Sequence, residues 1–160
     1  MKVKIGKFPS YRFWHRWFNL EPEQKISVKI DPWDTWSMDY TLAHIIVPML
    51  KQLKETKHGS PSTDDEDVPE HLRSTSAPPK ENDWDVDEFH FKRWDWVLDE
   101  MIWAFEQKID EEWDSQYYGP WIPPKEGEII GDFEWVDTEG RDKHHERMKN
   151  GFRLFGKDYE

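Results

Sequence analysis

The side chains of this chain best suited to chemistry are aromatic rings placed beside a potential anion site. Trp33 and Trp36 follow an alternating strand pattern, and Ser37 directly precedes an apolar helical pattern. A serine in that position caps a helix, whose first backbone N–H groups attract anions. Indole rings next to such a terminus can stack on a nucleobase. The pattern predicts that Trp33, Trp36 and Ser37 form part of a nucleotide-type ligand site.

Three basic side chains further along the chain are the expected partners of a ligand phosphate. His90 and Arg93 are spaced one helical turn apart, and Arg147 belongs to a basic stretch near the end. All three fall beside the apolar stripe of their helix, which leaves them available to an anion. The alternatives are an ion pair between Arg147 and the acidic middle of the chain, and a place in the core for Trp36.

Other polar patterns do not predict a reaction. Asp87 and His90 have the spacing of metal-binding helical bundles, but a bundle site needs a second such pair. The segment 144–146 lacks the second histidine of a zincin helix, and phosphate-binding glycine loops and a GxSxG elbow are absent from the sequence. The acidic run 64–67 is typical of a solvated charge run. We expect no enzyme activity, no catalytic residue, no metal and no cofactor.

Composition indicates a folded chain with unevenly distributed charge. The 160 residues include 11 tryptophans and no cysteine, and the net charge is −12. Residues 1–30 carry +5, whereas residues 61–140 carry −18. An acidic chain repels the phosphate backbone, so a general nucleic-acid binder is disfavoured. No apolar run approaches the roughly 20 residues of a membrane span, and these patterns predict a cytoplasmic protein with no membrane partner.

Hydrophobic periodicity predicts the elements that would position these residues. Alternation predicts strands over 1–5 and 25–31, with their apolar side chains buried, and a weaker strand over 128–136. Helical periodicity predicts a helix over 38–56, kinked at Pro48. Residues 58–82, rich in serine, proline and acids, are expected to form a long, flexible loop.

The strongest pattern is a helix over 85–113. Its apolar stripe, which is expected to be the main core contact, comprises Phe91, Trp94, Leu98, Met101, Ile102, Phe105 and Ile109. Trp96 and Trp103 fall nearly opposite this stripe among charged residues. They are expected to pack under the N-terminal aromatic segment, to meet another subunit or to line a ligand site. Our hypothesis is a homo-oligomer interface formed by Trp96 and Trp103 together with Trp14 and Trp17.

A last helix is predicted over 141–155, with its buried stripe on His145, Met148, Phe152 and Phe155 and a C-cap at Gly156. The combined expectation is a single α+β domain over residues 1–160. A small antiparallel sheet would pack against three main helices, and the long acidic loop would join the first helix to the second.

Three segments of the sequence resemble a family of uncharacterised small proteins encoded by tailed bacteriophages. They are IDPWDTWSMDYTLAHIIVPMLKQLKETKHGSPSTDDEDVPEHLRS, WDVDEFHFKRWDWVLDEMIWAFEQKIDEEW and HHERMKNGFRLFGKDY. The resemblance implies action in the cytoplasm of an infected host cell and carries no assigned activity. It favours a non-enzymatic sponge that sequesters a nucleotide-type immune signal and so counters host defence. The alternative is a virion structural component, or a protein-binding component such as a host-enzyme inhibitor, with tryptophan-rich subunit contacts.

Overall fold

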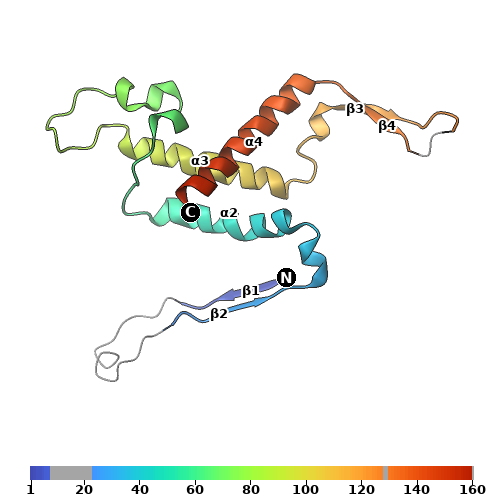
Figure 1. Cartoon of the computed structure of the whole chain (residues 1–160), viewed down its shortest axis with the longest axis horizontal. Helices are drawn as coiled ribbons and strands as arrows, with labels where there is room; N and C mark the ends of the chain where they lie inside the picture. The colour runs from blue at the N-terminus through green and yellow to red at the C-terminus, as the bar shows by residue number, and fades with distance from the viewer. Residues whose placement is uncertain (8–22, 128–129, 160) are drawn as a thin grey trace. The chain divides into compact units, whose positions relative to one another are not determined.

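The computed structural model describes residues 1–7, 23–127 and 130–159, which form two compact units (Figure 1). Unit 1 is Met1–Thr41 and unit 2 is Leu42–Glu160. The helix α2 (Met38–Thr56) begins in the last residues of unit 1 and continues into unit 2. Each unit has its own internal contacts, and the single domain expected from the sequence stays a prediction.

Unit 1 contains an antiparallel pair of short strands, as the alternation predicts. Strands β1 (Lys2–Ile5) and β2 (Ile26–Lys29) pair with Val3 opposite Val28 and Ile5 opposite Ile26. Because side chains alternate along a strand, this register places the four apolar side chains on one face. The opposite face carries the lysines of both strands. A one-turn 3₁₀ helix, η1 (Pro32–Thr35), follows β2 and leads towards α2.

The apolar face of this strand pair is exposed, contrary to the sequence expectation. Ile26 retains 62% of its accessible surface, and Ile5, Val28 and Ile30 are each more than half exposed. Alternation determines which side chains share a face, but burial of that face requires a second layer. Within the described part of unit 1, no such layer is present.

Unit 2 is built around three helices: the greater part of α2, α3 (His90–Ile109) and α4 (Thr138–Asp158). In Figure 1, α2 and α3 run side by side and α4 crosses α3. Two ion pairs between α2 and α3 support this arrangement, Lys51 with Glu106 and Lys54 with Asp99, and Lys57, directly after α2, pairs with Asp95 of α3. The sequence predicts the bounds of α2 correctly, and the helix continues through Pro48.

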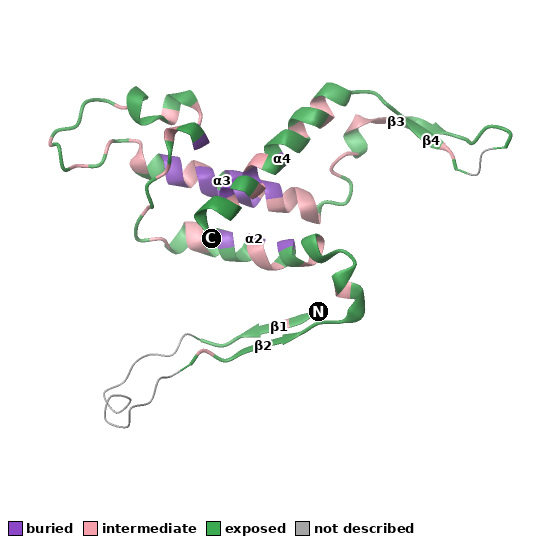
Figure 2. Cartoon of the chain, in the orientation of Figure 1, coloured by how far each residue is buried: buried purple, intermediate pink, exposed green. Residues whose placement is uncertain are grey.

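The core lies along α3, as predicted, and is drawn in purple in Figure 2. Its buried cluster comprises Leu50, Val68, Trp94, Val97, Leu98, Met101, Ile102 and Leu154. Three members of the predicted stripe differ from expectation, because Phe91 is exposed and Phe105 and Ile109 are only half-buried. The stripe is centred nearer Val97 and Met101, where both α2 and α4 contribute side chains to the cluster.

Helix α3 is shorter than the predicted range 85–113. Before the helix begins, the carboxylate of Asp87 accepts a hydrogen bond from the backbone N–H of Phe89, at 2.9 Å. This bond stabilises a turn at residues 87–89 instead of a further helical turn. After Ile109, Asp110 adopts an extended conformation, with φ −80° and ψ 100°, which ends the helix. Side chains that bond to nearby backbone groups compete in this way with helix continuation.

Helix α4 is longer than predicted, and a different stripe is buried. Its buried residues are Met148, Gly151 and Leu154, whereas His145 is exposed and Phe152 and Phe155 are half-buried. Gly151 has no side chain, so α4 can approach α3 closely at this point. The face of α4 that is buried against α3 is therefore the face that contains Gly151. The predicted C-cap at Gly156 is wrong, because the helix continues to Asp158.

The long loop between α2 and α3 is anchored to the helices by its acidic residues. Within it are three short 3₁₀ turns: η2 (Asp65–Asp67), η3 (Glu70–Leu72) and η4 (Ser74–Ser76). Asp67 is buried and accepts hydrogen bonds from Arg153 and Lys157 of α4. The acidic run is therefore not simply solvated, because part of it connects this loop to α4.

A second strand pair precedes α4. Strand β3 (Tyr118–Ile122) follows the turn η5 (Ser115–Tyr117) and pairs antiparallel with β4 (Asp132–Trp135). The predicted strand 128–136 contains β4, whereas the sequence patterns do not predict β3. The α+β class is confirmed, with two small sheets in place of one. Among the described residues, none of the helices has the length and apolar character needed to cross a membrane.

Candidate functional site

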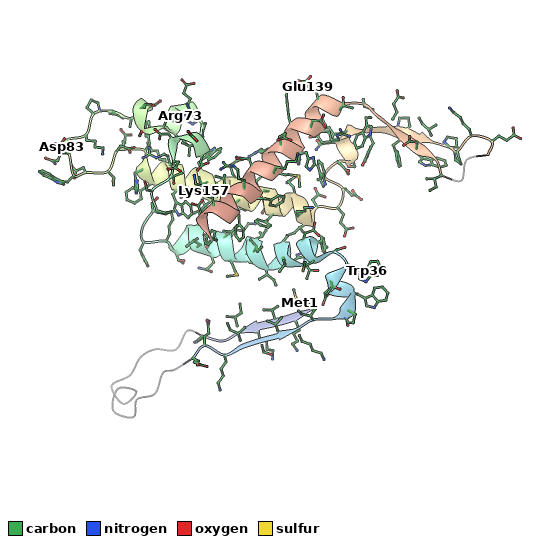
Figure 3. All side chains as sticks on the ribbon, viewed as in Figure 1. Met1, Trp36, Arg73, Asp83, Glu139 and Lys157 are labelled. Atoms are coloured by element: carbon green, nitrogen blue, oxygen red, sulfur yellow. The ribbon has the colours of Figure 1, made fainter. Side chains whose placement is uncertain are left out.

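Trp33 and Trp36 form an exposed aromatic pair in unit 1. Their ring centroids lie 6.5 Å apart at an interplanar angle of 28°, and the two side chains retain 79% and 83% of their accessible surface. Figure 3 shows the side chain of Trp36 pointing away from the ribbon. Two large apolar rings so fully exposed contribute little to the core, which argues against the structural alternative for Trp36.

Two aspartates fix the turn that carries this pair. The Asp31 carboxylate accepts a hydrogen bond from the backbone N–H of Trp33, and the backbone N–H of Asp31 donates to Asp34. The ammonium group of Met1 lies 2.7 Å from the Asp34 carboxylate. The hydrogen bond from that ammonium group is the main cause that lowers the pKa of Asp34. These contacts join the start of β1 to η1, and Ser37 directly precedes α2.

Lysines of the strand pair lie next to this turn. Lys2 and Lys29 occupy directly opposite positions of the register, and together with Met1, Ile30 and Asp31 they line a shallow pocket of about 280 Å³. Lysine is the only charged residue type in segments 1–7 and 25–30. Unit 1 therefore combines a locally cationic surface with two free indole faces, a combination that suits a planar anion.

The predicted cations His90, Arg93 and Arg147 lie in unit 2. Arg93 is only 4% exposed, and it donates to both carboxylate oxygens of Asp87 and to the backbone carbonyl of Leu72. The expectation that Arg93 is available to an anion is wrong, because Asp87 and the Leu72 carbonyl already occupy its guanidinium. His90 packs edge to face on Phe91, with centroids 5.2 Å apart.

Arg147 also has partners within its own unit. It donates to both carboxylate oxygens of Glu100, at 2.9 and 2.7 Å, and its guanidinium lies 3.9 Å from the centroid of the Trp103 ring. This is the ion pair with the acidic middle of the chain that the sequence left open. A shared site for Trp33, Trp36, Ser37, His90 and Arg147 stays a prediction, since these residues belong to two units.

The second face of α3 is covered by α4 of the same chain. Trp103 is half-buried under Arg147 and His144, whose ring centroid lies 4.9 Å from its own. Trp96 is half-buried against the core cluster. Packing within unit 2 therefore accounts for the partial burial of both indoles, and α4 provides the cover over Trp103. Trp14 and Trp17 lie outside the described residues, so an oligomer interface with them stays a prediction.

A histidine site that the sequence did not indicate lies beside Trp103. His144 stacks on Trp113, with centroids 4.8 Å apart, and its Nδ1 lies 3.1 Å from the Tyr117 hydroxyl. Burial is the main cause that lowers the pKa of His144, and the nearby charge of Arg147 adds to it. Among the described residues, its Nε2 has no hydrogen-bond partner. The neutral His144 ring packs between the indoles of Trp103 and Trp113. The sequence patterns did not indicate this cluster, because residues 113, 117 and 144 are far apart in the chain.

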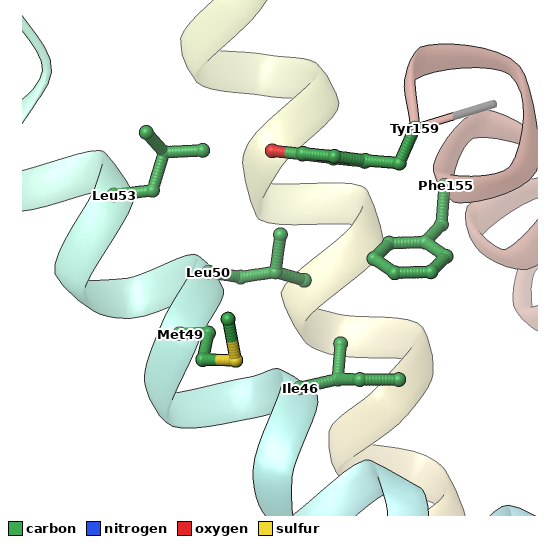
Figure 4. Close-up of a pocket in the computed structure, with 6 residues that line it drawn as sticks. All are labelled: Ile46, Met49, Leu50, Leu53, Phe155 and Tyr159. Carbon is green, nitrogen blue, oxygen red and sulfur yellow. The ribbon is translucent and has the colours of Figure 1, made fainter. Parts of the chain in front are cut away.

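An apolar groove lies between α2 and the end of α4 (Figure 4). The lining residues, Ile46, Met49, Leu50, Leu53, Phe155 and Tyr159, enclose about 360 Å³. Met49 and Tyr159 are exposed at its rim, whereas Leu50 at its base is buried. The groove offers hydrophobic contact and almost no polar group to a ligand. It is thus suited to a protein side chain rather than to a nucleotide.

No protein-family model, curated protein or solved structure matches this chain, so its function must be inferred from the arrangement of its own residues.

Proposed function

We propose that this chain is a non-enzymatic binding protein that sequesters a nucleotide-type ligand through unit 1. The observation that supports this best is the exposed Trp33–Trp36 pair beside a strand pair whose only charges are lysines. Base stacking on aromatic rings together with cationic side chains for phosphate is the general mode of nucleotide recognition without chemistry. Lys2 and Lys29 take the role that the sequence assigned to Arg93 and Arg147.

The two indoles are close enough to act on one base. Stacked carbon atoms contact at about 3.5 Å, so a ring inserted between two others needs about 7 Å. The centroids of Trp33 and Trp36 are 6.5 Å apart, and both rings are exposed. A base can stack on either exposed indole, and the similar inclination of the two rings allows both to contribute to one site.

The resemblance to a phage family supplies the biological setting of this proposal. In that setting the ligand is a nucleotide immune signal of the host, and its sequestration counters host defence. Sequestration requires tight binding and no turnover, which agrees with a site made of stacking surfaces and lysines. The infected cell's cytoplasm is the compartment in which such a signal is found.

Isothermal titration with a panel of cyclic and linear nucleotides tests this proposal. We expect one class of nucleotide to bind, and Trp36→Ala to weaken its binding by about tenfold or more, since stacking on one aromatic ring contributes about 1–3 kcal/mol. Lys2→Ala with Lys29→Ala should weaken binding and reduce its salt dependence. Trp84→Ala removes an equally exposed indole outside unit 1 and is the matched control.

Two outcomes would contradict the proposal. One is the absence of binding by every nucleotide at millimolar concentration, and the other is nucleotide binding that Trp36→Ala leaves unchanged. Arg147→Gln separates the two possible sets of cations. If Arg147→Gln abolishes nucleotide binding while circular dichroism shows an intact fold, the phosphate is bound by Arg147 of unit 2 and not by the lysines of unit 1.

The apolar groove of unit 2 favours a second candidate, a protein-binding or virion component with subunit contacts. Met49 stands exposed on α2 at the rim of a cavity bounded by Phe155 and Tyr159. A projecting side chain next to a cavity is the local geometry of a self-complementary, two-fold interface. A homo-oligomer would then use this groove in place of Trp96 and Trp103.

A further inference from the structure

The β3–β4 strand pair presents an aromatic surface to solvent. In the register, Tyr118 lies opposite Trp135 and Trp121 lies opposite Phe133. Phe133 and Trp135 share a face of β4, and an irregularity of the register between Tyr118 and Trp121 places their two rings on that same face. Tyr118 packs on both aromatic residues of β4, with centroids 4.4 Å from Trp135 and 5.3 Å from Phe133. Trp121 is 55% exposed, and Phe133 and Trp135 also remain exposed. We call these four residues the aromatic face.

A glycine allows the ring of Trp121 to approach the backbone directly before β4. A Cβ atom at Gly131 would lie 2.6 Å from the ring of Trp121 and 2.5 Å from the backbone oxygen of Ile122. No side chain could be accommodated there without moving the indole. The ring of Trp121 thus lies close to the backbone at Gly131, and the side chain retains 55% of its accessible surface.

The charge around the aromatic face is strongly negative. Segment 111–139 contains nine acidic residues and a single lysine, Lys125. Asp114 lies at the face itself, where it accepts a hydrogen bond from the Tyr118 hydroxyl at 2.6 Å. This field repels phosphates and attracts cations. The aromatic face is therefore unsuited to the nucleotide proposed for unit 1.

The chain itself shows how a cation binds to this face. The guanidinium of Arg141 lies 4.2 Å from the centroid of the Trp135 ring, and it donates two hydrogen bonds to the Asp142 carboxylate. Stacking on an indole with a carboxylate at the edge is the preferred environment of arginine, because its planar group is weakly hydrated. Trp121 and Phe133 offer similar ring surfaces, and the two side chains retain 55% and 46% of their accessible surface.

We infer that the aromatic face is a docking surface for an arginine-containing basic segment of a partner protein. Arginine side chains of the partner stack on Trp121 and Phe133, as Arg141 does on Trp135. The surrounding carboxylates steer the segment to the face and accept its remaining hydrogen bonds. The site lies in unit 2 and is independent of the nucleotide site proposed for unit 1.

Fluorescence anisotropy with labelled peptides tests the inference on the full chain. The probes are an arginine–glycine repeat peptide, the same peptide with lysine, and an aspartate–glycine peptide. We expect the arginine peptide to bind several-fold more tightly than the lysine peptide, and the acidic peptide not to bind. Trp121→Ala should weaken arginine-peptide binding by about tenfold, because it removes the larger exposed ring.

Control variants separate stacking from general electrostatic attraction. Trp84→Ala removes an exposed indole elsewhere in unit 2 and should leave the affinity unchanged. Trp121→Tyr keeps a ring and should restore most of the binding. Trp121 is exposed, so its replacement should leave the circular dichroism spectrum unchanged outside the aromatic bands.

Several results would overturn the inference. These are failure of the arginine peptide to bind, equal affinity for the arginine and lysine peptides, or binding that Trp121→Ala does not weaken. Neutral oligosaccharides, such as a chitin hexamer, test the other ligand class that stacks on exposed aromatic rings. Their binding to the aromatic face in place of the arginine peptide would also overturn it.

Discussion

At the scale of single residues, buried charge in unit 2 is matched by a defined partner. Arg93 is almost fully enclosed, yet both of its terminal nitrogens have acceptors in Asp87 and the Leu72 carbonyl. Burying an ion without a partner costs several kcal/mol, so removal of Asp87 alone should destabilise the fold strongly by leaving the Arg93 charge unpaired. Arg93 thereby joins the start of α3 to the loop that contains η3.

Replacement of Asp87 tests the structural role of this pair. Asp87→Asn leaves the Arg93 charge buried without its anion and should lower the free energy of unfolding by about 3 kcal/mol. Glu88→Gln is the matched control, because Glu88 forms an exposed pair with Lys92 and its loss should cost less than about 0.5 kcal/mol. Chemical denaturation of both variants measures the difference. Equal effects of the two substitutions would refute the role of the buried pair.

The same pair predicts a dependence of stability on pH. The hydrogen bond from Arg93 is the main cause that lowers the pKa of Asp87 in the folded chain. The ionised carboxylate therefore stabilises the fold above its unfolded pKa of about 3.9, and this contribution is lost as the pH falls through the lower folded pKa. In Asp87→Asn, the loss of stability on acidification below about pH 4 should be smaller than in the wild-type chain.

At the scale of elements, the crossing of α3 and α4 depends on one glycine. A Cβ atom at Gly151 would overlap the Cβ of Ala104 and would lie 2.6 Å from the backbone oxygen of Glu100. Both neighbours belong to α3, and neither is a flexible side-chain end. The close contact is what allows Leu154 to reach the core cluster and Arg147 to reach Glu100.

Gly151→Ala should separate the two helices and destabilise the chain by about 1–3 kcal/mol, even though alanine favours helix. Gly156 lies in the same helix, and a methyl group added there would meet no atom within 4 Å, so Gly156→Ala should stabilise by about 0.5–1 kcal/mol. Thermal unfolding of both variants gives the comparison. A stabilising effect at both positions would show that the helix crossing tolerates a methyl group.

These two glycines also show how far the sequence predicts the fold. Hydrophobic periodicity predicts α2, the core stripe of α3 and the presence of α4, because each helix buries a repeating pattern. It cannot distinguish Gly151 from Gly156, since a glycine at a helix crossing leaves no periodic signal. For the site, the sequence singled out Trp33 and Trp36, but the buried pairing of Arg93 depends on contacts that only the folded chain brings together.

At the scale of the whole molecule, the two units differ in charge. Unit 1 has seven basic and five acidic residues, a net charge of +2, whereas unit 2 has fifteen basic and twenty-nine acidic residues, a net charge of −14. A single chain therefore offers one surface suited to anions and another suited to cations.

A two-fold dimer through the α2–α4 groove is the prediction at this scale. We expect light scattering at micromolar concentration to give twice the mass of one chain. Met49→Asp should shift the protein to monomer without unfolding it, since Met49 is exposed and a charge would be buried at the interface. Met38→Asp, at a similarly exposed methionine outside the groove, is the control. A wild-type monomer would contradict the prediction.

The Trp33–Trp36 pair has an optical consequence. Two indoles held at 6.5 Å and inclined by 28° have electronic transitions that couple, which produces paired bands of opposite sign in far-ultraviolet circular dichroism. Those bands overlap the helical signal of α2, α3 and α4, so helix content calculated from such a spectrum will be in error until the pair is removed by Trp36→Ala. A planar ligand that enters between the rings changes the coupling, which gives this protein a label-free spectroscopic reporter of its own occupancy.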